Sequence, residues 1–79
     1  MRIQIKLYAT LRRYQPDLPR GAALLLAVPP GTTVNQVLQQ LAIPDNVPLV
    51  TMVNSSVCRL DCVLAEGDTL NLFPPVAGG

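Results

Sequence analysis

Apolar and polar side chains alternate along the first strand that the sequence predicts. Over residues 2–8 the apolar members are Ile3, Ile5 and Leu7, a period of two that is typical of a half-buried strand. The apolar run 22–28 lacks this period, but its length and the Pro-Pro-Gly after it favour a second strand paired with the first. Between the two, the sequence predicts an irregular connection with one short helical turn near residues 11–14.

The spacing of apolar residues then changes and predicts a helix. Thr33 and Gln36 have the spacing of a capping box at its start, and Pro44 ends it near Ala42 or Ile43. We therefore expect a helix of about ten residues with one apolar face that covers a sheet. This face consists of Val34, Val37, Leu38 and Leu41.

The second half of the chain predicts further strands separated by turns. Residues 49–53 and 69–73 have strand character, with a turn at 54–56 after the first and a turn at 66–68 before the second. Val57 resumes a short extended segment between them. This order predicts an α+β domain in which one main helix lies across a mixed four- to five-stranded sheet, the β-grasp (ubiquitin-like) arrangement.

The composition limits the functions open to this chain. Its 79 residues, 49% hydrophobic and 14% charged, predict one small globular domain, and no apolar run reaches the roughly 20 residues that span a bilayer. A net charge of +1 gives no case for nucleic-acid binding, although Arg12, Arg13 and Arg20 cluster in one segment. Because histidine is absent, we expect no metal site and no self-sufficient hydrolase. No targeting signal is visible, so the expected location is cytoplasmic.

Cys58 and Cys62 form a lone C-x-x-x-C pattern. Without histidine or a second cysteine pair, this pattern does not fill a tetrahedral zinc site, and cytosolic thiols stay reduced. We therefore expect two small, reduced, buried or half-buried side chains. Asp61 and Asp68 receive no catalytic role either, because Asp68 follows a glycine in a turn where its side chain bonds the backbone.

The end of the chain carries the most unusual chemistry. Its two prolines end the preceding strand and favour a stiff extended form, so we divide the chain into a domain, 1–73, and a Gly-Gly tail, 74–79. The carboxylate of Gly79 is a poor electrophile and would need activation by another enzyme, most simply adenylylation with ATP. The alternative is an ordinary frayed terminus. The tail reads Pro74-Pro75-Val76-Ala77-Gly78-Gly79.

Several motifs of this chain occur together in one known family. They are Tyr8-Ala9-Thr10-Leu11-Arg12, Thr33-Val34, Val53-Asn54, Gly67-Asp68 and the Phe-Pro-Pro-Val-x-Gly-Gly terminus. By these motifs the chain resembles the small subunit of molybdopterin synthase, a family of ubiquitin-like sulfur carriers. Residues 13–30 match only in general character, and Asn54-Ser55 stands where many relatives have Asn-Gly. The double proline favours the molybdopterin branch over the thiamine branch.

The resemblance implies a non-catalytic carrier subunit rather than an enzyme in its own right. An adenylating activating enzyme would use ATP on Gly79, and a persulfide sulfur donor would convert the product to a thiocarboxylate. The large subunit of molybdopterin synthase would then take this sulfur to build the dithiolene of molybdopterin, for the molybdenum or tungsten cofactor. The chain itself would bind no cofactor.

The partner surface follows partly from the strand pattern and partly from the resemblance. Tyr8 and Phe73 leave the core faces of strands that are neighbours in a β-grasp sheet, so we expect the two rings to lie together on the exposed surface. The resemblance implies that Val57 completes an apolar patch there and that residues 74–79 also contact the partner. Isolated surface hydrophobic residues are the alternative. Arg12 is expected either to pair with a partner carboxylate or to be solvated.

Two other functions share these features. A ubiquitin-like modifier would be joined through Gly79 to lysines of target proteins after the same activation chemistry. A β-grasp binding module without chemistry would not need the terminal glycines. A sulfur carrier for another pathway, such as thiamine synthesis, is a variant of the first hypothesis.

Overall fold

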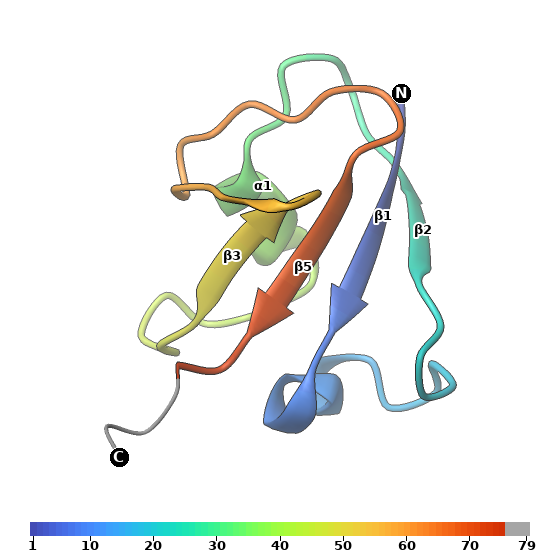
Figure 1. Ribbon diagram of the computed structural model, residues 1–79, viewed down its shortest axis with the longest axis vertical. Coiled ribbons are helices and arrows are strands. Elements are labelled where there is room, and N and C mark those ends of the chain that lie inside the picture. Colours follow the sequence, from blue (N-terminus) through green and yellow to red (C-terminus); the bar gives the residue numbers. More distant parts are fainter. Residues whose placement is uncertain (76–79) are drawn as a thin grey trace.

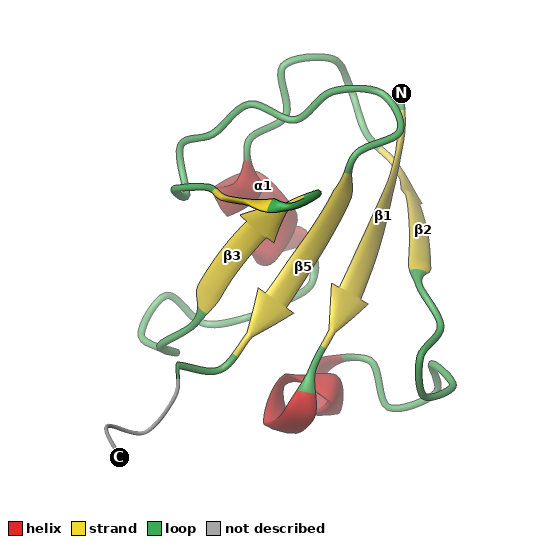
Figure 2. Cartoon of the chain, viewed as in Figure 1, coloured by secondary structure: helices red, strands yellow, loops and turns green. Residues whose placement is uncertain are grey.

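The computed structural model describes residues 1–75 and builds them around one mixed sheet (Figures 1 and 2). Five strands, one α-helix and one 3-10 helix follow one another along this part of the chain. In order they are β1 (Arg2–Leu7), η1 (Ala9–Tyr14), β2 (Leu24–Ala27), α1 (Val34–Gln40), β3 (Val50–Val53), β4 (Ser56–Val57) and β5 (Thr69–Phe73).

The strand order β2-β1-β5-β3-β4 puts the last strand at the centre of the sheet. β5 runs parallel to β1 and antiparallel to β3, and the β1–β2 and β3–β4 pairs are antiparallel. This arrangement confirms the predicted hairpin and the mixed sheet. It also confirms that the first and last strands are neighbours, with Lys6 paired with Asn71 and Leu7 with Leu72.

The core lies between one face of this sheet and α1, which Figure 1 shows behind the strands. Alternate residues of β1 and β5 point to this side, and Ile5, Leu70 and Leu72 are completely buried there. From the helix, Val34 and Val37 are equally buried, as the apolar spacing predicts. Among residues 1–75, neither helix packs on the opposite face of the sheet, where Val50, Val57 and Leu25 are exposed.

The helix begins as predicted and ends earlier than predicted. The Thr33 side chain accepts from the backbone of Gln36, and the Gln36 side chain accepts from the backbone of Thr33. α1 ends at Gln40, so the expected length of about ten residues was wrong. Ala42 adopts φ 59°, and the Ile43 amide donates to the Leu38 carbonyl at 3.0 Å. This Schellman arrangement ends the helix before Pro44 is reached.

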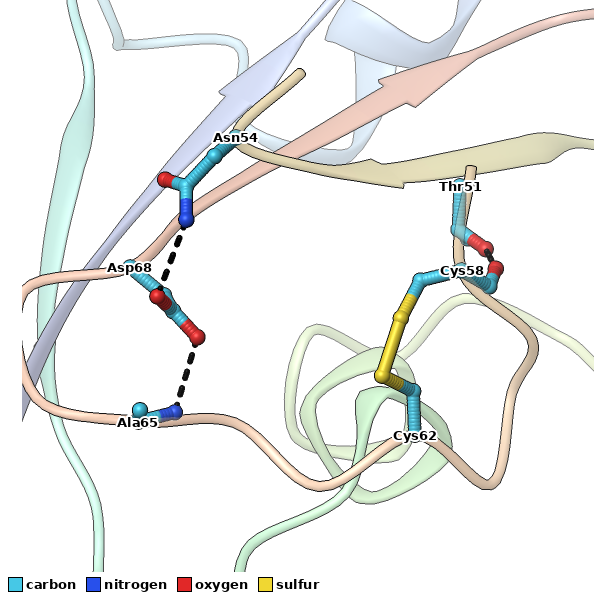
Figure 3. Close-up of a disulfide and its surroundings, with 6 residues drawn as sticks. All are labelled: Thr51, Asn54, Cys58, Cys62, Ala65 and Asp68. Carbon is cyan, nitrogen blue, oxygen red and sulfur yellow. Dashed lines mark hydrogen bonds between the residues drawn. A yellow bond between two sulfur atoms is a disulfide. The ribbon is translucent and has the colours of Figure 1, made fainter. Parts of the chain in front are cut away.

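Asp68 fixes the turn that delivers the chain to β5 (Figure 3). Its carboxylate accepts from the Ala65 amide at 2.8 Å and from Asn54 Nδ2 at 3.1 Å. The predicted backbone bonding of Asp68 is therefore confirmed. Asn54 in turn accepts from the Thr69 amide, so the β3–β4 turn is tied to the start of β5. Gly67 takes φ 81°, which explains a glycine at this position.

Along residues 1–75, no helix combines the length and the apolar character needed to cross a membrane.

Candidate functional site

The uncovered face of the sheet holds a stacked aromatic pair at the point where β5 ends. The rings of Tyr8 and Phe73 lie 4.3 Å apart between centroids and are inclined by 13°. The Tyr8 amide donates to the Leu72 carbonyl at 3.0 Å, which continues the β1–β5 ladder by one residue and places the two rings side by side. The expectation that they lie together on the exposed surface is confirmed.

A polar contact fixes the orientation of this pair. The Tyr8 hydroxyl donates to Asn71 Oδ1 at 3.1 Å, and the Asn71 amide group donates to the backbone carbonyls of Asn54 and Thr69 at 3.4 Å. Tyr8 is therefore held at one side by stacking and at its tip by a hydrogen bond. A ring that is already ordered loses less conformational freedom when a partner covers it.

Val57 lies on the same face but is not adjacent to the aromatic pair. It pairs with Met52 of β3, which pairs with Asn71 of β5, and it is 73% exposed. Val50, which pairs with Phe73, is also exposed and links the two positions. The continuous apolar surface is thus Tyr8, Phe73, Val50, Met52 and Val57, named here the open-face patch.

Sequence reasoning did not assign Val50 and Met52 to this surface. Their strand was predicted, but not its alternation about Thr51, which pairs with Leu72 and is buried. In this strand the polar residue, Thr51, faces the core, and its apolar neighbours Val50 and Met52 face the opposite side of the sheet. Its hydroxyl is satisfied by donating to the Cys58 carbonyl (Figure 3).

Arg12 lies beside the open-face patch, in η1, and is half-buried. It lines a surface groove of about 680 Å³ that also includes Tyr8. Arg13 points elsewhere, because its guanidinium lies 5.2 Å from the centre of the Tyr14 ring and donates to the Tyr14 hydroxyl. The clustered arginines of the sequence therefore separate: Arg12 and Arg20 line the groove, whereas Arg13 is held by Tyr14.

The two cysteines are joined in a disulfide, so the expectation of reduced thiols was wrong for this structure (Figure 3). The fold brings their Cα atoms to 6.0 Å, within bonding range. Both side chains are half-buried, as expected. The Cys58 amide donates to the Thr51 carbonyl and the Cys62 carbonyl accepts from the Val34 amide, so the bridge connects the β3 edge with the start of α1.

Of the predicted tail, Pro74 and Pro75 are described and continue directly from the end of β5. Pro74 is half-buried and Pro75 is exposed. The predictions for Val76, Ala77, Gly78 and Gly79 lie outside the described residues. Among residues 1–75, no group of three or more potential ligands is placed to hold a metal ion.

Comparisons with known proteins agree with this geometry. The family model described as the ThiS family matches residues 5–79. SAMP1 from Haloferax volcanii is 26% identical, with 100% of each chain covered and a TM-score of 0.77. No curated protein sequence matches the chain.

Two further solved structures share the fold. A putative molybdopterin converting factor, subunit 1, from Pyrococcus furiosus is 18% identical over 96% of this chain and 99% of that one, with a TM-score of 0.75. Subunits 1 and 2 of the molybdopterin-converting factor from Helicobacter pylori form a complex in which the matched chain is 15% identical, with 100% of each chain covered and a TM-score of 0.64. At these identities the likeness concerns the fold, whereas the family model covers the sequence from β1 to Gly79. The chain therefore belongs to the ThiS family of ubiquitin-like sulfur carriers.

Proposed function

We propose that the chain is the small subunit of a molybdopterin synthase and that Gly79 carries the transferred sulfur as a thiocarboxylate. The observation that carries this proposal is the continuity of β5 with the tail. The central strand passes the ordered Tyr8–Phe73 pair and leads straight into Pro74-Pro75, so the residues after it begin at the edge of a surface suited to a partner.

The body of the domain is well suited to holding such a tail. β5 is hydrogen-bonded on both sides, to β1 and β3, and its inward residues Leu70 and Leu72 are buried. The point from which the tail starts is therefore fixed. A reactive group tethered to a docked domain reaches its target at a high effective concentration, without the entropic cost of a separate encounter.

The chemistry requires partners, because the carboxylate of Gly79 is a poor electrophile and must first be activated by another enzyme. An activating enzyme would transfer AMP from ATP to the Gly79 carboxylate, with release of pyrophosphate. The terminal sulfur of a donor persulfide would then attack the adenylate and displace AMP, which gives an acyl disulfide. A second thiol of the donor would cleave this S–S bond, which leaves the thiocarboxylate on the glycine and a disulfide on the donor. Proton transfers in these steps fall to the partners, since the chain has no histidine.

The partner proposed for the open-face patch is the large subunit of molybdopterin synthase. In the Helicobacter pylori structure, subunit 1, which has the fold of this chain, is in complex with subunit 2. Buried aromatic residues dominate binding at many protein interfaces, and Tyr8 and Phe73 are two of the three aromatic residues here. Docking them would bring the tail to the same partner.

A protein modifier is the second candidate, favoured by a specific observation. The 26% identical structure is SAMP1, and a second solved structure, 25% identical with a TM-score of 0.76, is named small archaeal modifier protein 1. Both functions would use the same activated glycine. They differ in the group that is joined to the activated glycine carbonyl, which is a sulfur atom in a sulfur carrier and a lysine amine in a protein modifier.

The deciding experiment is the intact mass of the chain after incubation with a matching activating enzyme, ATP and a persulfide donor. A mass gain equal to replacement of one oxygen by sulfur, absent when Gly79 is deleted, is the expected result. Lysine-linked conjugates without this gain would favour the modifier. An unchanged mass with no conjugates would leave the β-grasp domain as a binding module.

A further inference from the structure

A basic groove adjoins the aromatic pair at the end of the sheet where β1 and β5 finish. The groove has a volume of about 680 Å³ and lies between the end of β1, η1 and the loop that leads to β2. Lys6, Arg12 and Arg20 contribute to its lining, whereas no aspartate or glutamate does. These three cations come from separate segments of the chain, so only the folded structure brings them together around the groove.

The charges are also unevenly spread along the chain. Four of the six basic residues lie within residues 6–20, together with Asp17, and the other four acidic residues lie within residues 45–68. Glu66 and Asp68 lie at the opposite end of the sheet, where the Glu66 carboxylate accepts from the Arg2 amide at the start of β1. The groove end of β1 and β5 thus carries three basic residues, whereas at the other end Arg2 lies with Glu66 and Asp68.

The groove cations are not occupied by the protein itself. Within residues 1–75, the side chains of Lys6, Arg12 and Arg20 make no hydrogen bond, in contrast to Arg13, which donates to Tyr14. Three like charges around one groove repel one another, and a bound anion would relieve this repulsion. The groove thus has the charge complementarity of an anionic ligand.

The shape and the apolar lining select the kind of anion. Leu18, Pro19 and Ala22 line the groove together with the cations, and apolar surface gives no advantage to a bare phosphate. A volume of about 680 Å³ matches several linked residues rather than one small ion. A peptide with spaced carboxylates satisfies both features. Its carboxylates pair with the cations, and the apolar parts of its side chains contact the apolar lining.

We propose that this groove docks an acidic peptide segment of the protein that acts on the tail. Tyr8 belongs to the groove and stacks on Phe73, and Pro74 follows Phe73, so an occupant of the groove lies next to the start of the tail. The identity of that protein as activating enzyme or synthase subunit rests on the proposed function. The groove itself is tested on the isolated chain.

The test is a titration of the isotope-labelled chain with a short synthetic peptide of alternating glutamate and alanine. Binding is monitored by the NMR chemical shifts of the backbone amides. Shifts concentrated in residues 6–22 are expected, with an affinity that falls as salt rises. Lys6→Gln and Arg20→Gln should each weaken binding about two- to fivefold, the range for partly solvated ion pairs. Arg2→Gln and Arg59→Gln remove the same charge elsewhere and should leave binding unchanged.

Three results would overturn the proposal. The first is no binding of the peptide, or equal binding of a matched peptide with glutamine in place of glutamate. The second is equal weakening by Arg2→Gln and Arg59→Gln, which would mean attraction by net charge alone. The third is saturation of the same amides by inorganic phosphate at the same concentration, which would identify a site for small anions.

A second measurement separates this proposal from the proposed function. With the activating enzyme, the Lys6→Gln/Arg20→Gln variant should show a KM for the chain raised about tenfold and a retained kcat, since the tail is intact. An unchanged KM would exclude use of the groove by this enzyme. If the wild-type chain gains neither sulfur nor AMP, the proposed function fails, while the peptide titration still decides whether the groove binds acidic segments.

Discussion

The replacement Phe73→Asp is expected to weaken binding of the proposed partner, the large subunit of molybdopterin synthase, without unfolding the domain. Phe73 is half-buried, so the substitution loses part of the roughly 1.5–3 kcal/mol that full burial of such a side chain contributes. Loss of the stack with Tyr8 adds about 0.5–1.5 kcal/mol. A chain of 79 residues has a stability of about 4–12 kcal/mol at 0.05–0.15 kcal/mol per residue, so a loss of about 2–3 kcal/mol leaves most molecules folded.

The same substitution also lowers the free energy of binding. Truncation of an aromatic residue at the centre of an interface typically costs about 2 kcal/mol or more, which corresponds to about 30-fold in Kd. The aspartate adds the cost of burying an unpaired carboxylate against the partner. We therefore expect a loss of at least 30-fold in affinity for the large subunit of molybdopterin synthase.

Calorimetric titration with the large subunit and urea unfolding of each variant measure the two effects. Leu25→Asp is the matched control, because Leu25 pairs with Gln4 on the same sheet face, is 72% exposed and lies on the outer strand β2. It places the same charge outside the open-face patch and should leave Kd within about twofold of wild type, below the level of a contact residue. A folded Phe73→Asp variant with the wild-type Kd would remove Phe73 from the interface.

Three further predictions concern stability and are measured by urea unfolding. Ala42→Gly should raise the free energy of unfolding by about 1 kcal/mol, because glycine accepts the positive φ of this helix end, and a decrease would refute that account. Asp68→Ala should lower it by about 1–2 kcal/mol through loss of the bonds to Ala65 and Asn54, and a change no greater than that of the exposed Asp45→Ala would contradict this. Reduction of the Cys58–Cys62 disulfide should lower it by about 2 kcal/mol, as expected for a short loop, and the oxidised chain should show no thiols with a thiol reagent.

Local signals along the chain predicted most of the fold. The alternation around Ile5, the Thr33–Gln36 capping box and the glycine turn before β5 each depend on residues close in sequence, and the structure contains all three. The end of the helix was missed because it depends on a tertiary contact. Ile43 is buried against the same core as Leu38, and this packing holds Ala42 in a conformation for which alanine gives no signal.

The candidate site was predicted less completely because it combines distant residues. Tyr8 and Phe73 were placed together correctly, since strand faces and the β-grasp order were sufficient. Val50 and Met52 were not assigned to the surface, because Thr51 between them is buried against expectation. The sequence showed a cluster of arginines but not that Lys6 joins Arg12 and Arg20 around one groove, which requires the β1–β2 connection to fold back.

The central position of β5 has a consequence for synthesis of the protein. Every other element is made before residues 69–73, yet β1 and β3 are joined in one sheet only through β5, which pairs with both. A chain still on the ribosome, or one truncated before β5, would expose two strand edges and the apolar side chains of the core, features that invite aggregation and proteolysis. Premature release therefore gives a product for degradation, because the strand from which the tail continues is also the strand that completes the sheet.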